Sequence, residues 1–204
     1  IPVNGKPFLE RQIDWLYGKG IDKIHLALGH GAPLIQDWII SKSFSHLNLS
    51  VSVEAWPIGT AGALKWAEPC FKSDPFIVVN GDTILPNLDL EGFIESSSNC
   101  LLTIVAVKTD NTERFGAMEI DSNDKILSFR EKELKGTGRA NGGVYAISAR
   151  LMDKIERGKK LSLEENIFPG IVRDSQAKAF PCKPPLLDMG TPEGLEEMGK
   201  YFQQ

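Results

Sequence analysis

Two aspartates, Asp82 and Asp188, each follow a short apolar run and lie near a glycine, in "FIVVNGDTI" and "LLDMGTPEG". Such an apolar run predicts a buried strand, and a carboxylate at its end loses hydration unless it gains a partner. Mg²⁺ is usually held by one or two carboxylates together with phosphate oxygens and water. We therefore interpret both aspartates as ligands of one metal ion that carries phosphates. The alternative is that each aspartate only caps the segment that follows it.

A glycine-rich turn, "PIGTAGAL" (residues 57–64), runs into a predicted helix. Its small residues would allow a ligand to approach the backbone, and free N–H groups at a helix start attract polar groups. The turn lacks the Gly-Lys-Ser/Thr sequence of a Walker loop. A plain helix N-terminus would have a similar composition, so this alternative stays open.

A third candidate segment is "FREKELKGTGRANGGVY", which gathers Glu131, Lys132 and Asn141 around glycines. Its charges could face a cleft, or they could simply be solvated at the end of a strand. Asn141 precedes two glycines, which is typical of a turn residue with positive φ but also suits a ligand of sugar hydroxyls. The histidines His25, His30 and His46 show no metal-binding spacing.

The order of predicted elements indicates how these segments are positioned. Strands and helices alternate over the first 108 residues, the pattern of a mostly parallel sheet flanked by helices. Ligands of such sheets bind at the carboxyl ends of the strands, where "NGD" lies. The predicted strands are 24–28, 49–53, 76–80 and 101–107, and the predicted helices are 7–19, 34–40, 59–67 and 90–96.

The second half predicts a small antiparallel extension and a closing helix. Turn residues 122–124 separate two strand-like runs, which indicates a hairpin. Thr191 and Pro192 are typical of the N-cap and first position of a helix over 192–202. We predict one α/β domain over residues 1–204. Its other elements are strands near 142–148, 178–182 and 185–190 and helices near 151–156 and 163–172.

Composition excludes several classes of protein. The net charge of −4, without a long run of one sign, argues against a basic face for nucleic acid. No apolar stretch approaches the ~20 residues of a membrane span. The three cysteines, without close pairs, predict reduced, buried thiols rather than disulfides or a zinc site. We expect a cytoplasmic protein without nucleic-acid or membrane partners.

Taken in order, these segments resemble the sugar-phosphate nucleotidyltransferases, also called nucleotide-sugar pyrophosphorylases. The resemblance covers essentially the whole chain, through "PVNGKPFLERQIDWL", "EAWPIGTAGAL", "VVNGD", "FREK", "NGGVY" and "LLDMGTPEG". Within the family, "NGGVY" and "LSLEENIFPGIV" are most similar to guanylyltransferases acting on D-glycero-D-manno-heptose 1-phosphate, which are relatives of mannose-1-phosphate guanylyltransferases.

The resemblance implies a Rossmann-like fold of the GT-A type and a reaction of NTP with sugar 1-phosphate to give NDP-sugar and pyrophosphate. The expected substrates are GTP and a heptose or mannose 1-phosphate. The resemblance implies Mg²⁺ as cofactor. It also implies a role in nucleotide-sugar biosynthesis, for example of lipopolysaccharide or capsule precursors, and a homodimer as one assembly to test. Glu54 could accept from guanine N1–H and the 2-amino group together, or be an exposed acid at a strand end. The implied roles are Asp82 and Asp188 for metal and catalysis, Lys132 for catalysis, Glu131, Lys132, Asn141 and Gly143 for the sugar phosphate, and Glu54, Gly59, Thr60 and Gly62 for the nucleotide.

Two departures from the family pattern leave alternatives open. The family's N-terminal strand and "GGxGTRL…KP" loop are not in this sequence, and we expect them to precede Ile1; "EKELKG" replaces the more common "EKP". One alternative is a uridylyltransferase acting on an amino-sugar 1-phosphate such as N-acetylmuramate 1-phosphate. Another is a non-catalytic, pyrophosphorylase-like regulatory subunit. A glycosyltransferase would more often show Asp-x-Asp where this chain has Gly81-Asp82-Thr83.

Overall fold

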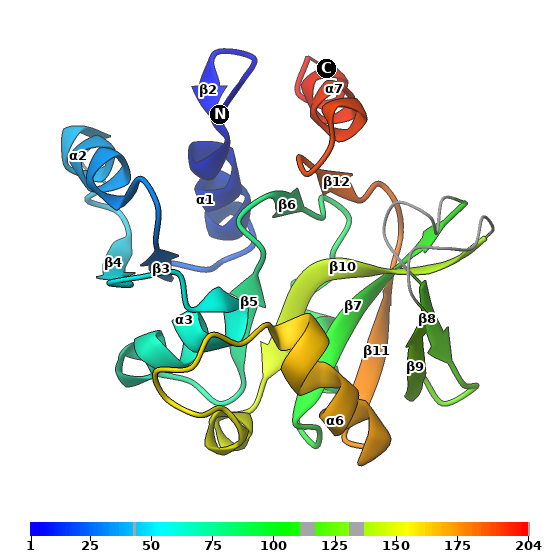
Figure 1. The fold of residues 1–204 in the computed structure, drawn as a ribbon. Helices are drawn as coiled ribbons and strands as arrows, with labels where there is room; N and C mark the ends of the chain where they lie inside the picture. The colour runs from blue at the N-terminus through cyan, green and yellow to red at the C-terminus, as the bar shows by residue number, and fades with distance from the viewer. Residues whose placement is uncertain (43, 111–116, 131–136, 204) are drawn as a thin grey trace.

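A six-stranded sheet forms the centre of the structure. The computed structural model describes residues 1–204 except 43, 111–116, 131–136 and 204. The long strand β10 (Gly138–Ile147) pairs with β7 (Leu102–Thr109) along one edge, while β5 (Phe76–Val79) and β8 (Ala117–Ile120) pair with it elsewhere (Figure 1). The remaining two strands of the sheet are β9 (Ile126–Arg130), beside β8, and β11 (Ala177–Cys182), beside β7.

The strand directions confirm the predicted mixed, mostly parallel α/β fold. Strand β3 (Lys23–Leu28) runs parallel to β4 (Asn48–Val53), and β11 runs parallel to β7. Strands β5 and β7 are both antiparallel to β10 and are therefore parallel to each other. Strands β10 and β9 run opposite to the other strands of this sheet, and β8 and β9 form the predicted antiparallel hairpin.

The helices largely follow the predicted boundaries. Their bounds are α1 (Phe8–Gly18), α2 (Ala32–Lys42), α3 (Gly59–Ala67), α4 (Leu90–Ser96), α6 (Phe168–Arg173) and α7 (Pro192–Tyr201). The helix predicted over 163–172 divides into a π-helical turn, Leu163–Ile167, and α6. Pro169 explains the division, because it has no N–H and its ring would collide with the carbonyl four residues earlier. The predicted helix near residue 151 is a 3-10 turn, Ala149–Lys154.

Three short strands were not predicted from the sequence. Strands β1 (Pro2–Val3) and β2 (Lys6–Pro7) form a hairpin whose turn residues Asn4 and Gly5 have φ of 47° and 74°. Asn-Gly is the typical pair for such a turn, since both positions need positive φ. The third, β6 (Thr83–Ile84), pairs antiparallel with β12 (Leu187–Asp188).

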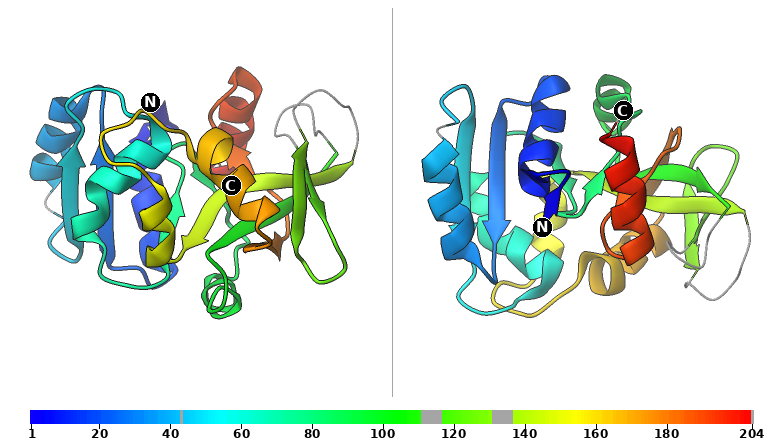
Figure 2. Two further views of the ribbon diagram at one scale, coloured as in Figure 1. Left: turned by 60° about the horizontal axis from the view of Figure 1, so that its bottom comes forward. Right: turned by 90° about the horizontal axis from the view of Figure 1, so that it is seen from above.

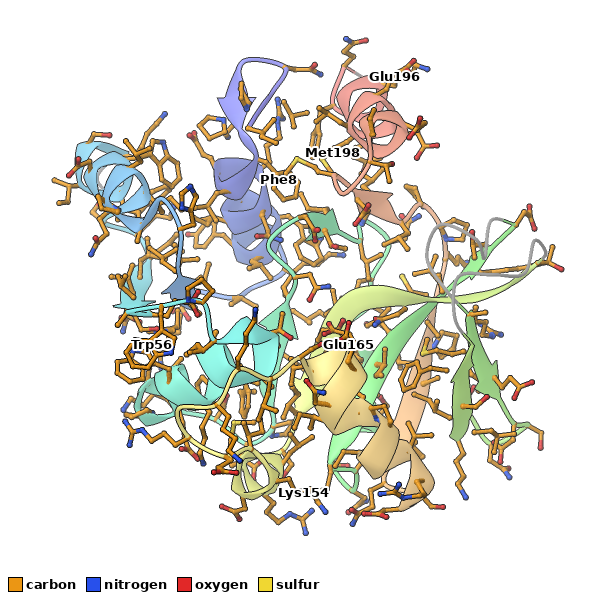
Figure 3. All side chains as sticks on the ribbon, in the orientation of Figure 1. Phe8, Trp56, Lys154, Glu165, Glu196 and Met198 are labelled. Atoms are coloured by element: carbon orange, nitrogen blue, oxygen red, sulfur yellow. The ribbon has the colours of Figure 1, made fainter. Side chains whose placement is uncertain are left out.

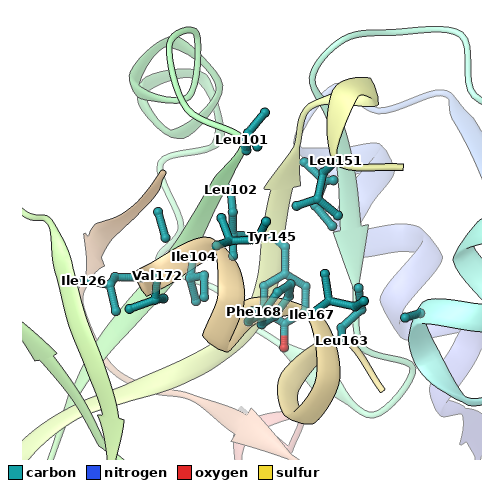
Figure 4. Close-up of a cluster of buried hydrophobic side chains, with 14 of the residues drawn as sticks. Leu101, Leu102, Ile104, Ile126, Tyr145, Leu151, Leu163, Ile167, Phe168 and Val172 are labelled. Atoms are coloured by element: carbon teal, nitrogen blue, oxygen red, sulfur yellow. The ribbon is translucent and has the colours of Figure 1, made fainter. Parts of the chain in front are cut away.

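Alternation along β7 and β10 covers both faces of the central sheet. Ile104 and Tyr145 belong to a core under α6 and the turn before it, drawn in Figure 4. Their neighbours Val105 and Val144 belong to a second core with Phe93 of α4. This alternation is what a strand buried on both faces requires.

A third core joins the two ends of the chain. Phe8 of α1 and Met198 of α7 belong to it, together with Val3, Ile84 and Leu187 (Figure 3). Seen from above, α1 and α7 flank the region where β6 and β12 lie (Figure 2). The core therefore braces the β6–β12 pair, which carries Asp188 and follows Asp82.

The cysteines correct one expectation. All three are free, but Cys70 is exposed and Cys100 is half-buried, whereas only Cys182 is buried. Cys70 ends a 3-10 turn, Glu68–Cys70, that projects beyond α3, so the prediction of burial is wrong for it. Among the described residues, no helix is both long enough and apolar enough to cross a membrane.

Candidate active site

The structure brings the segments of Asp82 and Asp188 together. In the β6–β12 pair, Asp188 lies opposite Thr83, and the Met189 N–H donates to the Asp82 carbonyl at 3.0 Å. The two segments pair as antiparallel strands. Two acids from distant parts of the sequence thus occupy adjacent backbone positions.

Each carboxylate of this pair accepts a hydrogen bond from its own segment. Asp82 Oδ1 accepts from the Thr83 hydroxyl at 3.0 Å, and Asp188 Oδ1 accepts from the Gly190 N–H at 3.0 Å. Both residues are half-buried. The N-cap of α7 is Thr191, whose side chain accepts from Gly194 N–H, so the alternative that Asp188 caps this helix is wrong.

The residues around Asp82 fit a divalent cation bound to phosphates. A Cβ added at Gly81 would meet nothing within 4 Å, and this glycine has no positive φ, so the chain itself does not require a glycine there. Two oriented carboxylates beside open backbone suit Mg²⁺, which takes its other ligands from water and substrate. In the described part of the chain, no cluster of three or more potential metal ligands occurs, and this donor set does not need one.

A buried glutamine holds the Asp82 loop from behind. Gln12 of α1 is 6% exposed, and its Nε2 donates to the carbonyls of Asn80 and Thr83, both at 2.8 Å. The sequence offered one signal that was not used. Gln12 lies one turn after Phe8 and next to Ile13 on the buried face of α1, where a polar side chain needs a specific partner.

Asn141 and Gly143 lie against the same loop. The Gly143 carbonyl accepts from the Asn80 N–H at 2.8 Å, and the Gly143 N–H donates to Asn141 Oδ1 at 3.0 Å. The positive φ belongs to Gly143, at 66°, and not to Asn141, so that alternative for Asn141 is wrong. A Cβ at Gly143 would lie 2.9 Å from Thr83 Oγ1. The close approach therefore requires glycine.

The glycine-rich first turn of α3 mainly contacts other backbone of the same chain. The N–H groups of Ala61 and Gly62 donate to the Leu161 carbonyl at 2.9 and 3.3 Å. A Cβ at Gly59 would collide with that carbonyl, and one at Gly62 would lie 2.8 Å from the Lys159 carbonyl. The expectation that these two N–H groups are open to a ligand is therefore wrong. Contact of Gly59, Thr60 and Gly62 with a nucleotide stays a prediction.

Glu54 follows β4 and closes the start of this turn. Its Oε2 accepts from the Ile58 N–H at 3.4 Å, and a Cβ at Gly29 would collide with its carboxylate. Glu54 is half-buried, so the alternative of an exposed acid is wrong. Trp56, labelled in Figure 3, is 59% exposed next to it. Recognition of a base by Glu54 stays a prediction.

Two predicted site residues, Glu131 and Lys132, lie outside the described residues. Strand β9 ends at Arg130, immediately before them. A hollow lined by Asp74, Ser97, Ser148 and Arg150, among others, contains none of the predicted site residues. It lies where β5 begins, whereas Asp82 follows the end of β5.

The fold is that of a nucleotidyltransferase, and the chain belongs to the nucleotidyl transferase family, whose model matches residues 1–204. The resemblance stated from the sequence is thereby confirmed. The D-glycero-alpha-D-manno-heptose 1-phosphate guanylyltransferase of Campylobacter jejuni is 31% identical over 194 residues, which are 94% of this chain and 84% of the relative.

A solved structure shows the same architecture. HddC from Yersinia pseudotuberculosis, complexed with GMP-PN, is 34% identical with a TM-score of 0.91, covering 99% of this chain and 88% of that one. The mannose-1-phosphate guanyltransferase of Neurospora crassa is 30% identical over 202 residues. That match covers 95% of this chain but 55% of the relative, so the chain spans about half the length of such relatives.

Proposed function

We propose that this protein joins GTP to a sugar 1-phosphate, a heptose or mannose 1-phosphate, and releases pyrophosphate. The observation that carries the proposal is the pairing of the Asp82 and Asp188 segments within a nucleotidyl transferase family member. The names of the relatives, guanylyltransferases for heptose and mannose 1-phosphate, support the choice of base and sugar. In this reaction an oxygen of the sugar phosphate attacks the α-phosphorus, and pyrophosphate leaves.

We propose Asp82 and Asp188 as the residues that hold Mg²⁺. When bound, the ion would neutralise negative charge on the reacting phosphates. The chain's own contribution is to orient the two carboxylates, through the Thr83 hydroxyl and the Gly190 N–H. Because the reaction needs little covalent work from the protein, positioning and charge neutralisation dominate catalysis.

The other substrate groups have proposed partners on neighbouring segments. Lys132 would neutralise the sugar phosphate as a compact positive charge. Its neighbour Glu131, with Asn141 and the backbone near Gly143, would hydrogen-bond sugar hydroxyls. Glu54 would accept from guanine, and the turn with Gly59, Thr60 and Gly62 would lie against the base or ribose. The contact of Gly143 with Asn80, and the bond of Asn141 to Gly143, support placing the sugar near the metal loop.

Two described strands, β3 and β5, each have an edge open to further pairing. Among the described strands, β3 pairs only with β4, and β5 pairs only with β10. Ile77, Val78 and Val79 of β5 are accordingly half-buried rather than buried. A further strand could pair with these edges. We also propose a cytoplasmic location, where nucleoside triphosphates are available, and a homodimer to be tested by light scattering.

A substrate panel tests the proposal. The full-length protein, as its gene encodes it, is incubated with Mg²⁺, each NTP and a set of sugar 1-phosphates, and pyrophosphate release is followed. We expect turnover with GTP and heptose or mannose 1-phosphate. Preference for UTP and an amino-sugar 1-phosphate would establish the uridylyltransferase alternative. Binding of a nucleotide sugar without turnover of any pair would favour the regulatory subunit.

A further inference from the structure

The carboxylate of Glu164 contacts hydroxyl groups from three different segments. Its Oε1 accepts from the Tyr145 hydroxyl at 3.2 Å, and its Oε2 accepts from Thr60 at 3.2 Å and from Ser162 at 3.1 Å. Every partner that the described residues give this half-buried carboxylate is a hydroxyl, and none is a lysine or arginine. Among the described residues, three neutral donors therefore orient this carboxylate.

Tyr145 connects Glu164 to the proposed sugar site. The tyrosine is fully buried, and its ring packs edge-on against Phe168 at 5.1 Å between centroids (Figure 4). Its hydroxyl also accepts from Asn141 Nδ2 at 3.1 Å. Burial and the nearby Glu164 charge raise the pKa of Tyr145, so the hydroxyl remains a donor at neutral pH. Asn141 is thus held on one side by Tyr145 and on the other by the Gly143 N–H.

Thr60 connects Glu164 to the proposed nucleotide site. Its hydroxyl accepts from the Leu163 N–H at 2.8 Å and donates to Glu164. The Thr60 side chain is therefore fixed by two bonds to the segment that carries Glu164. The same segment is attached to α3 through the bonds of Leu161 to the N–H groups of Ala61 and Gly62.

We propose that Glu164 is a positioning residue that couples the nucleotide-binding turn at Thr60 to the sugar-binding Asn141. This inference rests on the proposed function, because it assigns Thr60 and Asn141 to the two substrates. Glu164 accepts from Thr60 and Tyr145 at once, so it fixes the separation of α3 from β10. Ordering of Thr60 by one substrate then favours the arrangement of Asn141 that the other substrate needs.

An acceptor-only group is required at this position. A carboxylate offers two oxygens and no donor, which matches three hydroxyls that all donate to it. A glutamine has the same shape, but its NH₂ group would face at least one of these three hydroxyls. Glu164→Gln therefore removes the coupling while changing little volume. Tyr145→Phe removes the link to Asn141 from the other side.

The kinetic experiment compares Glu164→Gln, Tyr145→Phe, the double variant and the control Glu165→Gln. Glu165, labelled in Figure 3, is the exposed neighbour of Glu164, and among the described residues no hydrogen bond joins its side chain to Thr60 or Tyr145. We expect each single variant to raise KM for both the NTP and the sugar 1-phosphate about tenfold, while kcat stays within about threefold. The double variant should be no worse than the single variants, because they break one connection.

Amide hydrogen exchange supplies a readout that does not need activity. In Glu164→Gln and Tyr145→Phe, we expect faster exchange at the Leu163 N–H and in the 58–62 turn, and unchanged exchange in Glu165→Gln. If Glu164→Gln and Glu165→Gln have the same KM for the NTP and the same KM for the sugar 1-phosphate, the coupling is wrong. If the wild type turns over no substrate pair, equal amide exchange in these two variants shows that the coupling is wrong. Absence of wild-type turnover overturns the proposed function by itself, and the exchange comparison then decides the coupling alone.

Discussion

The side-chain amide of Gln12 donates to the carbonyl of Thr83 across the core, at 2.8 Å, and makes an equal bond to Asn80. Both acceptors flank Asp82, so one buried side chain of α1 fixes both ends of the loop that carries this carboxylate. The connection explains how a helix that supplies no proposed ligand contributes to the site.

Replacing Gln12 should disturb the Asp82 loop more than it disturbs the core. In Gln12→Glu a carboxylate faces two carbonyl oxygens without a proton to donate, and in Gln12→Met both donors are lost. We expect unfolding free energy to fall by about 2–3 kcal/mol and half-saturation by Mg²⁺ to need at least about tenfold more metal. Thermal unfolding and Mg²⁺ titrations of pyrophosphate release measure these effects.

Ile13→Val provides the matched control for Gln12. Ile13 is the next residue of α1 and is 1% exposed, and the substitution should cost about 1 kcal/mol. Its apolar side chain makes no hydrogen bond to the Asp82 loop, so its Mg²⁺ dependence should equal that of the wild type. An equal shift in both variants would mean that Gln12 acts only through general stability.

The two aspartates should be needed for turnover and dispensable for folding. Asp82→Asn and Asp188→Asn preserve the hydrogen bonds from Thr83 and Gly190 but weaken metal binding. We expect kcat to fall about 100-fold or more in each, with thermal unfolding close to that of the wild type. Removal of Mg²⁺ with a chelator should abolish wild-type activity. Near-normal turnover of Asp82→Asn would remove this residue from the metal site.

A single methyl group at Gly143 should displace the Asp82 loop. In Gly143→Ala the new Cβ lies 2.9 Å from Thr83 Oγ1, at a residue whose φ is 66°. We expect a loss of about 1–2 kcal/mol from the left-handed conformation, together with lower kcat/KM. Gly18→Ala is the control, because a Cβ there meets nothing within 4 Å at the end of α1. Equal activity of both variants would contradict the close approach.

The sequence predicted those parts of the fold that depend on local pattern. Helices α3 and α4 begin and end where apolar spacing placed them, and Thr191 caps α7 as its side chain predicts. The meeting of the Asp82 and Asp188 segments was predicted because each closes an apolar run, and a metal ion shared by the two carboxylates stays a prediction. In contrast, β10 enters between β5 and β7 from more than thirty positions later in the chain. No local pattern encodes that order, since it depends on pairing between distant strands.

In the candidate site too, local pattern predicted some features, whereas contacts between distant segments were not predicted. Composition predicts an opening for a ligand at glycines 59 and 62, but the Leu161 and Lys159 carbonyls lie against them. Composition indicates only that something approaches the backbone closely, and cannot distinguish a ligand from another segment. Glu164 was missed for a related reason. Its significance comes from Thr60 and Tyr145, which are remote in sequence and adjacent only in the folded chain.

A half-buried histidine, His25, lies on the β3–β4 pair and should make stability sensitive to acid. The imidazole of His25 lies between two serine hydroxyls of β4, at 2.9 Å from Ser50 Oγ and from Ser52 Oγ. Burial lowers the pKa of His25 below its ordinary value. The unfolded chain therefore binds a proton at this residue more readily than the folded chain does. Stability should fall as the pH drops through about 6.5, the ordinary value for histidine.

Substitution separates this contribution from that of the many carboxylates. In His25→Gln the loss of stability between about pH 7 and pH 5 should be smaller than in the wild type, because the proton-binding difference is removed. His30→Gln, at an exposed histidine, should follow the wild-type curve. Urea unfolding at a series of pH values measures the three profiles. If His25→Gln and the wild type keep the same pH dependence, then the half-buried imidazole does not contribute to acid sensitivity, and the β3–β4 pair tolerates its protonation.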